Sequence, residues 1–303
     1  MRRVVVLGNN GFLGKNLMQE FPQATGVSLR DNTWERDIEN SDVIINLIGK
    51  AHDHKGTANE KEYYVVNVEL TKRIFNAFLK SSSKVLIHIS SIAAIQEYNS
   101  NKYLKEDDFC NPISWYGKSK REAEIWLLSQ NLPPNKKIII LRPPMIHGPH
   151  DKGNLGLLFK FINNGIPYPF SNFENSRSFI SIVNFCYFLR ELIESDNDIE
   201  SGIYHVSDDE PLSTKEIIHI MKEVTRKRVL NISLPKFFIR TIAWMGDYLP
   251  LPLNTIRLKK MTSNLLVSND KIKNALGLKD LKLSAKDGLI LTIKSFQNGD
   301  RPK

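Results

Sequence analysis

Short apolar runs, each bounded by glycine or polar residues, alternate along the first half of the chain with stretches whose apolar residues recur at helical spacing. Most of the runs are rich in valine and isoleucine, which is typical of strands buried on both faces of a parallel sheet. They occupy residues 2–7, 26–29, 42–49, 84–89 and 136–141. Because right-handed strand–helix–strand units build a parallel sheet, the pattern predicts an α/β fold with a doubly wound Rossmann sheet.

The connections between these runs differ in kind. Residues 60–80 carry an apolar stripe at helical spacing, and residues 115–130 predict a second long helix. Residues 32–42 leave no room for a full helix and strand. We therefore expect residues 34–38 to form only a rudimentary sheet edge.

The second half of the chain predicts a smaller, substrate-binding domain. Residues 202–206 read as a strand, and residues 213–226 read as a helix that opens with a capping box, Ser213 and Glu216. We expect both elements in the smaller domain. The predicted division is a dinucleotide-binding domain at 1–150 and a mainly substrate-binding domain at 151–303, with some segments returning to the Rossmann sheet.

Composition narrows the possible partners. The chain of 303 residues is 41% hydrophobic and 25% charged, as in a soluble globular protein, and its net charge of +9 suits an anionic partner. The candidates are a dinucleotide, a nucleotide-linked substrate, nucleic acid or an acidic membrane surface. Cys110 and Cys186 form no framework, which predicts free thiols in a reducing compartment. Residues 4–7 are too short for a signal-peptide core, and no apolar run reaches the roughly 20 residues of a spanning helix, so we expect a cytoplasmic protein.

Three glycines follow the first run, at the start of the first helical pattern. Gly8 permits a tight turn, Gly11 lets the backbone approach a pyrophosphate, and Gly14 lets the helix pack on the strand. A simple tight turn is the alternative, but the position after an N-terminal strand favours a dinucleotide site. The residues expected to contact the cofactor from this turn are Gly8, Asn10, Gly11, Phe12, Leu13 and Gly14.

The residues after the second strand bear on the choice of cofactor. Asp31 favours the ribose hydroxyl of NAD, whereas Arg30 favours the 2′-phosphate of NADP, so the choice stays open. Asp37 and Ile38 are candidates for contact with adenine, with a solvated turn as the alternative.

Further candidates lie where strands end, because ligands of open α/β sheets bind at the carboxyl edge. His52 and His54 lie close to the third strand but lack a third ligand, so we predict no metal site there. The prolines after Arg142 predict an extended segment along the nicotinamide. The cofactor candidates of this edge are Leu47, Ile48, Gly49, Asn67, Ile89, Pro143, Met145 and Ile146.

Tyr116 and Lys120 are one helical turn apart and share a helix face. A cation beside a phenol stabilises the phenolate, which predicts that Lys120 lowers the pKa of Tyr116 from about 10. Such a pair also occurs by chance on exposed helices. The glycine turn upstream and Ser91 at a strand end favour the catalytic interpretation.

The glycine turn, Ser90-Ser91, the Tyr116/Lys120 pair and Arg142-Pro-Pro together resemble the extended short-chain dehydrogenases/reductases of the NAD-dependent epimerase/dehydratase family. The resemblance implies NAD(P)H as cofactor. It also implies that Tyr116 is the acid/base, that Tyr116 and Lys120 contact the nicotinamide end of the cofactor, and that Ser91 binds the reacting oxygen of the substrate.

Within this family, residues 153–158, 165–170 and 175–182 resemble the segments that bind the nucleotide diphosphate in bacterial 4-ketoreductases making UDP-N-acetylquinovosamine or UDP-N-acetylfucosamine. The resemblance implies a UDP-linked sugar as partner, with Arg177 at the diphosphate and Asn154 at the nucleotide. His52 is the remaining substrate candidate. For Arg177 the alternative is a surface arginine, and for Asn154 it is the N-cap of the helix that follows.

Three functions stay open at this point. A 4-ketoreductase consumes NAD(P)H, a UDP-sugar 4-epimerase keeps its NAD, and a catalytically idle dinucleotide-binding module does neither. We expect a homodimer. We expect no nucleic-acid partner, because basic and aromatic residues do not interleave along the chain. The apolar segment 235–253 is interpreted mainly as a lid or subunit contact, with peripheral membrane association as the alternative.

Overall fold

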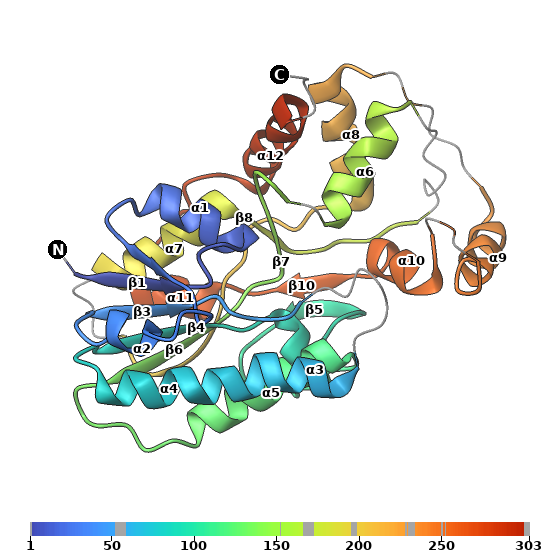
Figure 1. Ribbon diagram of the computed structural model, residues 1–303. Coiled ribbons are helices and arrows are strands. Elements are labelled where there is room, and N and C mark those ends of the chain that lie inside the picture. Colours follow the sequence, from blue (N-terminus) through green and yellow to red (C-terminus); the bar gives the residue numbers. More distant parts are fainter. Residues whose placement is uncertain are drawn as a thin grey trace.

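The computed structural model describes residues 2–51, 59–151, 153–165, 173–194, 199–227, 229, 234–249, 251 and 253–299. Its centre is a six-stranded sheet in the order β2-β1-β3-β4-β6-β9 (Figure 1). Every neighbouring pair in this sheet is parallel. The strands are β1 (Val4–Leu7), β2 (Thr25–Val27), β3 (Val43–Asn46), β4 (Val85–Ile89), β6 (Lys137–Arg142) and β9 (Gly202–His205). The predicted doubly wound fold is confirmed.

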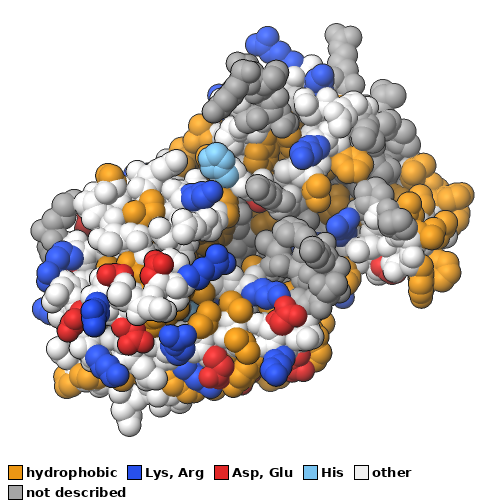
Figure 2. Space-filling view, in the orientation of Figure 1, with side chains coloured by type: hydrophobic (Ala, Val, Ile, Leu, Met, Phe, Trp, Pro, Cys, Tyr) orange, Lys and Arg blue, Asp and Glu red, His pale blue; other side chains and the backbone are white. Residues whose placement is uncertain are grey.

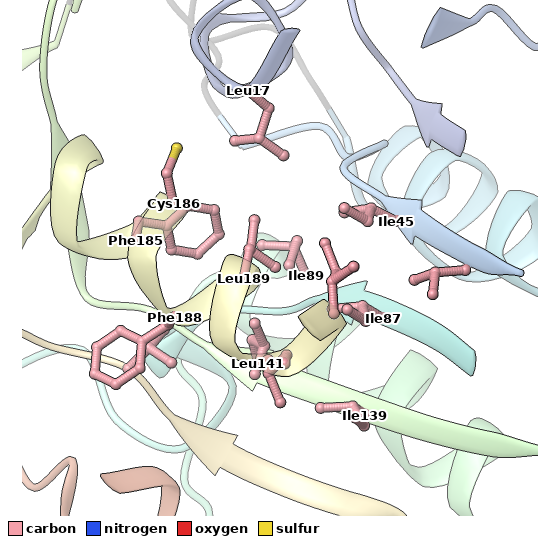
Figure 3. Close-up of a cluster of buried hydrophobic side chains, with 14 of the residues drawn as sticks. Leu17, Ile45, Ile87, Ile89, Ile139, Leu141, Phe185, Cys186, Phe188 and Leu189 are labelled. Atoms are coloured by element: carbon pink, nitrogen blue, oxygen red, sulfur yellow. The ribbon is translucent and has the colours of Figure 1, made fainter. Parts of the chain in front are cut away.

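Both faces of the sheet are covered by helices, because successive side chains of a strand point to opposite faces. Val4 and Val6 of β1 pack with α1 (Phe12–Glu20), α7 (Ile182–Glu194) and α11 (Asp270–Leu276). Figure 3 shows Leu17 of α1 and Phe185, Cys186, Phe188 and Leu189 of α7 over the isoleucines of the strands. Val5 and Leu7 pack instead with α4 (Leu70–Lys80) and α5 (Trp115–Leu128). The nearly continuous apolar strands thus supply two cores.

The predicted helix at 60–80 is present but interrupted. It runs as α3 (Glu60–Tyr64), the π-helical turn η1 (Val65–Glu69) and α4. Val68, Ile74, Phe75 and Phe78 of the predicted stripe are buried. The π-turn carries Asn67, and such turns are frequent at functional positions.

Two expectations are wrong. Residues 34–38 form no sheet edge: α2 (Trp34–Asp37) is a helical turn, and the side chains of Trp34 and Ile38 are buried in the core beside β1. The segment is too short for a full crossover helix. A single helical turn is nevertheless enough to bury both side chains against the sheet. The strand at 202–206 does not belong to the smaller domain either, because β9 pairs with β6 along its whole length.

A third core lies beyond the sheet, among helices of the C-terminal half. These helices are α6 (Asn154–Asn163), α8 (Thr214–Thr225), α9 (Lys236–Met245), α10 (Thr255–Thr262) and α12 (Ala285–Gly299). The predicted capping box of Ser213 and Glu216 opens α8. Two pairs of parallel strands connect this part to the sheet, β5 (Ser100–Leu104) with β10 (Leu265–Val267) and β7 (Met145–His147) with β8 (Phe179–Ser181). Within the described residues, no helix is both long and apolar enough to cross a membrane.

Gly14 tests how closely α1 packs on the turn before it. A Cβ at Gly14 would lie 2.3 Å from the carbonyl oxygen of Gly8, whereas a Cβ at Gly11 would lie 3.4 Å from the same atom. We expect Gly14→Ala to lower the free energy of unfolding by about 1–3 kcal/mol through overpacking. Urea denaturation measures this, with Gly11→Ala as the matched control. Equal stability of the two variants would contradict the close packing.

Candidate active site

The candidate residues gather at the carboxyl edge of the sheet because β1, β3, β4 and β6 all point the same way. Gly8 follows β1, and Gly49 lies just beyond β3. Ser91 follows β4, and Pro143 follows β6. In this arrangement, segments far apart in the sequence meet where ligands of open α/β sheets bind.

The glycine turn has the geometry of an anion-binding helix start. Gly8 has φ +87°, in the region that favours glycine. Gly11 is the N-cap of α1, with no capping bond from its own position and no acidic residue in the first turn. The N–H groups of that turn carry the positive end of the helix dipole, which attracts phosphate. The residues present therefore fit the pyrophosphate of a dinucleotide.

The residues expected to contact the adenosine end of the cofactor differ in their exposure to solvent. Arg30 and Asp31 are both exposed just beyond β2, so the structure leaves the choice between NAD and NADP where the sequence left it. Asp37 is exposed, but the side chain of Ile38 is fully buried. The side chain of Ile38 is therefore not accessible to a ligand.

Asn67, Gly49 and Lys120 come together although they are distant in sequence. The buried amide of Asn67 accepts a hydrogen bond from the Lys50 backbone N–H at 2.8 Å and donates one to Ser119 Oγ at 2.8 Å. It thereby joins the loop after β3 to α5. A Cβ at Gly49 would lie 2.9 Å from Lys120 Nζ, so glycine leaves this space open.

The start of α5 packs tightly against the segment after Ser91. Ser114 is the N-cap and accepts a hydrogen bond from the Gly117 N–H at 3.0 Å. A Cβ at Gly117 would lie 2.4 Å from the Ala93 carbonyl oxygen, which shows how near the helix comes. Tyr116 is half-buried there. Ser91 is also the N-cap of the short turn η2 (Ile92–Ala94).

Burial dominates the protonation of this cluster. It raises the pKa of Tyr116 above its usual value, and a hydrogen bond with Ser91 opposes the rise. Burial also lowers the pKa of Lys120 to about 8, against the attraction of Glu124. Lys120 Nζ donates a hydrogen bond to the Ile89 carbonyl oxygen at 2.9 Å. The pKa of Tyr116 is therefore not lowered as expected: burial raises it, and the group that opposes the rise is Ser91 rather than Lys120.

A buried ion pair, which the sequence reasoning missed, holds these elements together. Glu124 of α5 accepts hydrogen bonds from Arg142 Nε at 2.8 Å and from Arg142 Nη2 at 2.7 Å. Ser90 Oγ donates to the same carboxylate at 2.5 Å. Both charged side chains are 0% exposed. The available signal was the position of Glu124, one turn beyond Lys120 on the same helix face.

The substrate candidates lie on the C-terminal side. Arg177 Nη1 donates hydrogen bonds to Ser263 Oγ at 2.8 Å and to the Ser263 carbonyl at 3.1 Å, and burial lowers the pKa of Arg177 to about 10. Lys260 is a neighbour that the sequence reasoning missed: burial lowers its pKa, the charge of Glu97 opposes the fall, and the charge of Arg177 adds to it. His52 and the side chain of Asn154 lie outside the described residues. The N-cap of α6 is Gly153, so the alternative role of Asn154 as N-cap is wrong.

Glu124→Gln tests the ion pair. The change leaves the charge of Arg142 buried without a counter-charge, so we expect a loss of about 3 kcal/mol or more in the free energy of unfolding. Urea denaturation measures it. Glu122→Gln, at an exposed position of the same helix, is the matched control. A loss no larger than that of the control would show that the pair is not what joins α5 to the sheet.

Comparison with known proteins gives consistent results. The chain is 25% identical over 260 residues to UDP-glucose 4-epimerase of Vibrio cholerae, covering 77% of this chain and 79% of that protein. It is 24% identical over 256 residues to N-acetyl-α-D-glucosaminyl-diphospho-ditrans,octacis-undecaprenol 4-epimerase of Escherichia coli O157:H7, covering 77% and 75%. The structure of UDP-glucuronic acid 4-epimerase from Bacillus cereus in complex with NAD shares the fold, with a TM-score of 0.76 and 17% identity over 99% of this chain and 100% of that one.

The match to a protein family extends beyond the first half of the chain. Residues 4–207 match the NAD dependent epimerase/dehydratase family, from β1 to just beyond β9. The resemblance seen in the motifs is thus confirmed at the level of the family. The chain belongs to the NAD dependent epimerase/dehydratase family.

Proposed function

We propose that this protein is an NAD(P)-dependent oxidoreductase that acts at C4 of a UDP-linked hexose. The observation that carries the proposal is the meeting of Ser91, Tyr116 and Lys120 at the carboxyl edge of the sheet, the edge at which β1 leads into the glycine turn. The names of the relatives support the substrate class, since they describe 4-epimerases of a UDP-sugar and of a lipid diphosphate sugar.

The chain's own residues supply the proton chemistry. When bound, the nicotinamide supplies or accepts the hydride at C4. The raised pKa of Tyr116 keeps its phenol protonated at neutral pH, so it can deliver a proton to the oxygen of a 4-keto sugar. Ser91 donates a hydrogen bond to the same oxygen and polarises the carbonyl. Ketone, hydride and proton together give the alcohol, and the reverse order oxidises it.

The substrate diphosphate is assigned to the side of the site that carries Arg177. Arg177 and Lys260 are neighbouring cations with the carboxylate of Glu97 close to Lys260, and a bound anion would add to the charge compensation that Glu97 gives. A guanidinium offers paired N–H donors that match phosphate oxygens. This supports a nucleotide diphosphate as the part of the substrate recognised there.

Two reactions at C4 of the sugar are candidates, reduction and epimerisation. The resemblance of residues 153–158 and 175–182 to 4-ketoreductases favours reduction of a UDP-6-deoxy-4-keto-N-acetylhexosamine in surface polysaccharide synthesis. The 4-epimerase names of the relatives favour epimerisation of a UDP-hexose, in which the cofactor is regenerated. The same residues, Ser91, Tyr116 and Lys120, serve both.

Cofactor stoichiometry separates the two outcomes. Purified protein is incubated with UDP-4-keto-6-deoxy-N-acetylglucosamine and NADH or NADPH, and in parallel with UDP-glucose or UDP-N-acetylglucosamine, and the product sugars are identified. A reductase consumes one reduced cofactor per product, whereas an epimerase interconverts UDP-glucose or UDP-N-acetylglucosamine with its 4-epimer without net consumption of cofactor.

We expect Tyr116→Phe to lower kcat by about 10²-fold or more, as for loss of a general acid. Unchanged activity in Tyr116→Phe would favour the idle dinucleotide-binding module.

The pKa of Lys120 predicts a pH dependence of cofactor binding. Because its pKa is about 8, the ammonium is mostly charged at pH 7 and mostly neutral at pH 9. If its charge holds the cofactor, affinity for NADH falls by up to about tenfold across this interval. Titration of NADH fluorescence measures it. Lys120→Arg stays charged throughout, so its affinity should lose this pH dependence. An equal fall in both proteins would contradict the assignment.

A further inference from the structure

Helix α9 and the turn after it present a cluster of large apolar side chains to solvent. We call this cluster the α9 patch. Figure 2 shows apolar side chains gathered at the right-hand end of the molecule, where Figure 1 places α9. Exposure runs from 41% at Met245 to 76% at Tyr248. The members of the patch are Phe237, Phe238, Ile242, Trp244, Met245, Tyr248 and Leu249, with Ile256 of α10 beside them.

The patch is not an unfinished part of the protein's own core. The opposite side of α9 is already packed, because Ile239 and Ala243 are each 1% exposed and lie in the C-terminal core with Leu258 of α10. A Cβ at Gly246 would lie 1.8 Å from the Leu253 carbonyl oxygen, so the turn after α9 is also closely packed. Contiguous exposed apolar surface of this kind marks an interaction site.

Positive charge borders the patch. Lys236 and Arg240 are exposed and lie one turn apart on α9, between its buried side and its apolar exposed side. Residues 234–257 contain three lysines and arginines but one acidic residue, Asp247. The Asp247 carboxylate accepts a hydrogen bond from the Thr255 N–H at 2.9 Å. The surface therefore combines apolar side chains with a net positive rim.

We propose that the α9 patch docks on the surface of a bilayer that contains anionic lipid. Trp244 and Tyr248 pair edge to face at 5.4 Å and offer a polar N–H and O–H beside apolar rings, which suits the headgroup boundary. The phenyl rings of Phe237 and Phe238 enter the acyl region, and Lys236 and Arg240 meet lipid phosphates.

The charge distribution favours lipid over a second copy of the chain. A two-fold contact places the same patch of both copies face to face. Both copies would then bring Lys236 and Arg240 to the same contact, and each segment offers only Asp247 in compensation. Repulsion between like charges opposes such a contact, whereas anionic headgroups neutralise the same cations.

Vesicle sedimentation tests the proposal with the full chain. We expect the protein to pellet with vesicles of phosphatidylcholine that contain about one phosphatidylglycerol in four, to stay in solution with phosphatidylcholine alone, and to be released by about 0.5 M salt. Phe238→Ser/Trp244→Ser should lower the affinity at least about tenfold. Both residues are more than half exposed, so the variant keeps its fold.

Matched variants make the test specific. Phe109→Ser/Ile125→Ser removes two large apolar side chains that are also more than half exposed, elsewhere on the surface, and should bind as the unmodified chain does. Tyr116→Phe should also bind normally, so the result is independent of the proposed function. Absence of pelleting with the anionic vesicles overturns the proposal. So does a stable oligomer that Phe238→Ser/Trp244→Ser dissociates, because it would show that a second copy covers the patch.

Discussion

The buried pair of Glu124 and Arg142 is the constraint on which the candidate site depends. One carboxylate, from the middle of α5, receives the guanidinium at the end of β6 and the hydroxyl of Ser90 at the end of β4. Neither charge reaches solvent, so each needs the other. The pair thus fixes the helix that carries Tyr116 and Lys120 relative to the strand ends that carry Ser91 and Pro143.

Close backbone contacts reinforce this arrangement at both ends of the site. Gly117 lets the first turn of α5 approach Ala93, and Gly14 lets α1 approach the glycine turn. In each case a side chain of one carbon would occupy space that the neighbouring backbone already fills. The proposed proton donor, Tyr116, and the glycine turn are therefore carried by closely packed elements, which is what a positioned acid and a bound cofactor require.

Burial also determines the protonation of Tyr116 and Lys120. Burial raises the pKa of Tyr116 and lowers that of Lys120, so both neutral forms are favoured relative to water. A tyrosine in this setting is better suited to give a proton to a keto oxygen than to hold a standing negative charge. An anionic ligand beside Lys120 would favour its charged form, which would couple binding of the proposed cofactor to the protonation of this cluster.

The sequence alone determined the parallel sheet, the glycine turn, the helix of Tyr116 and Lys120, and the family, because buried strands, turns and helix faces leave local patterns. It misplaced β9, took the helical turn at Trp34 for a sheet edge, and gave Tyr116 a lowered pKa. It also missed Glu124 and Lys260. Each of these depends on which distant segments meet: the partner of β9 is β6, the partner of Glu124 is Arg142, and Tyr116 loses part of its hydration to neighbouring elements. Local spacing places a residue on a face, but only the tertiary structure decides what that face touches and how much water remains there.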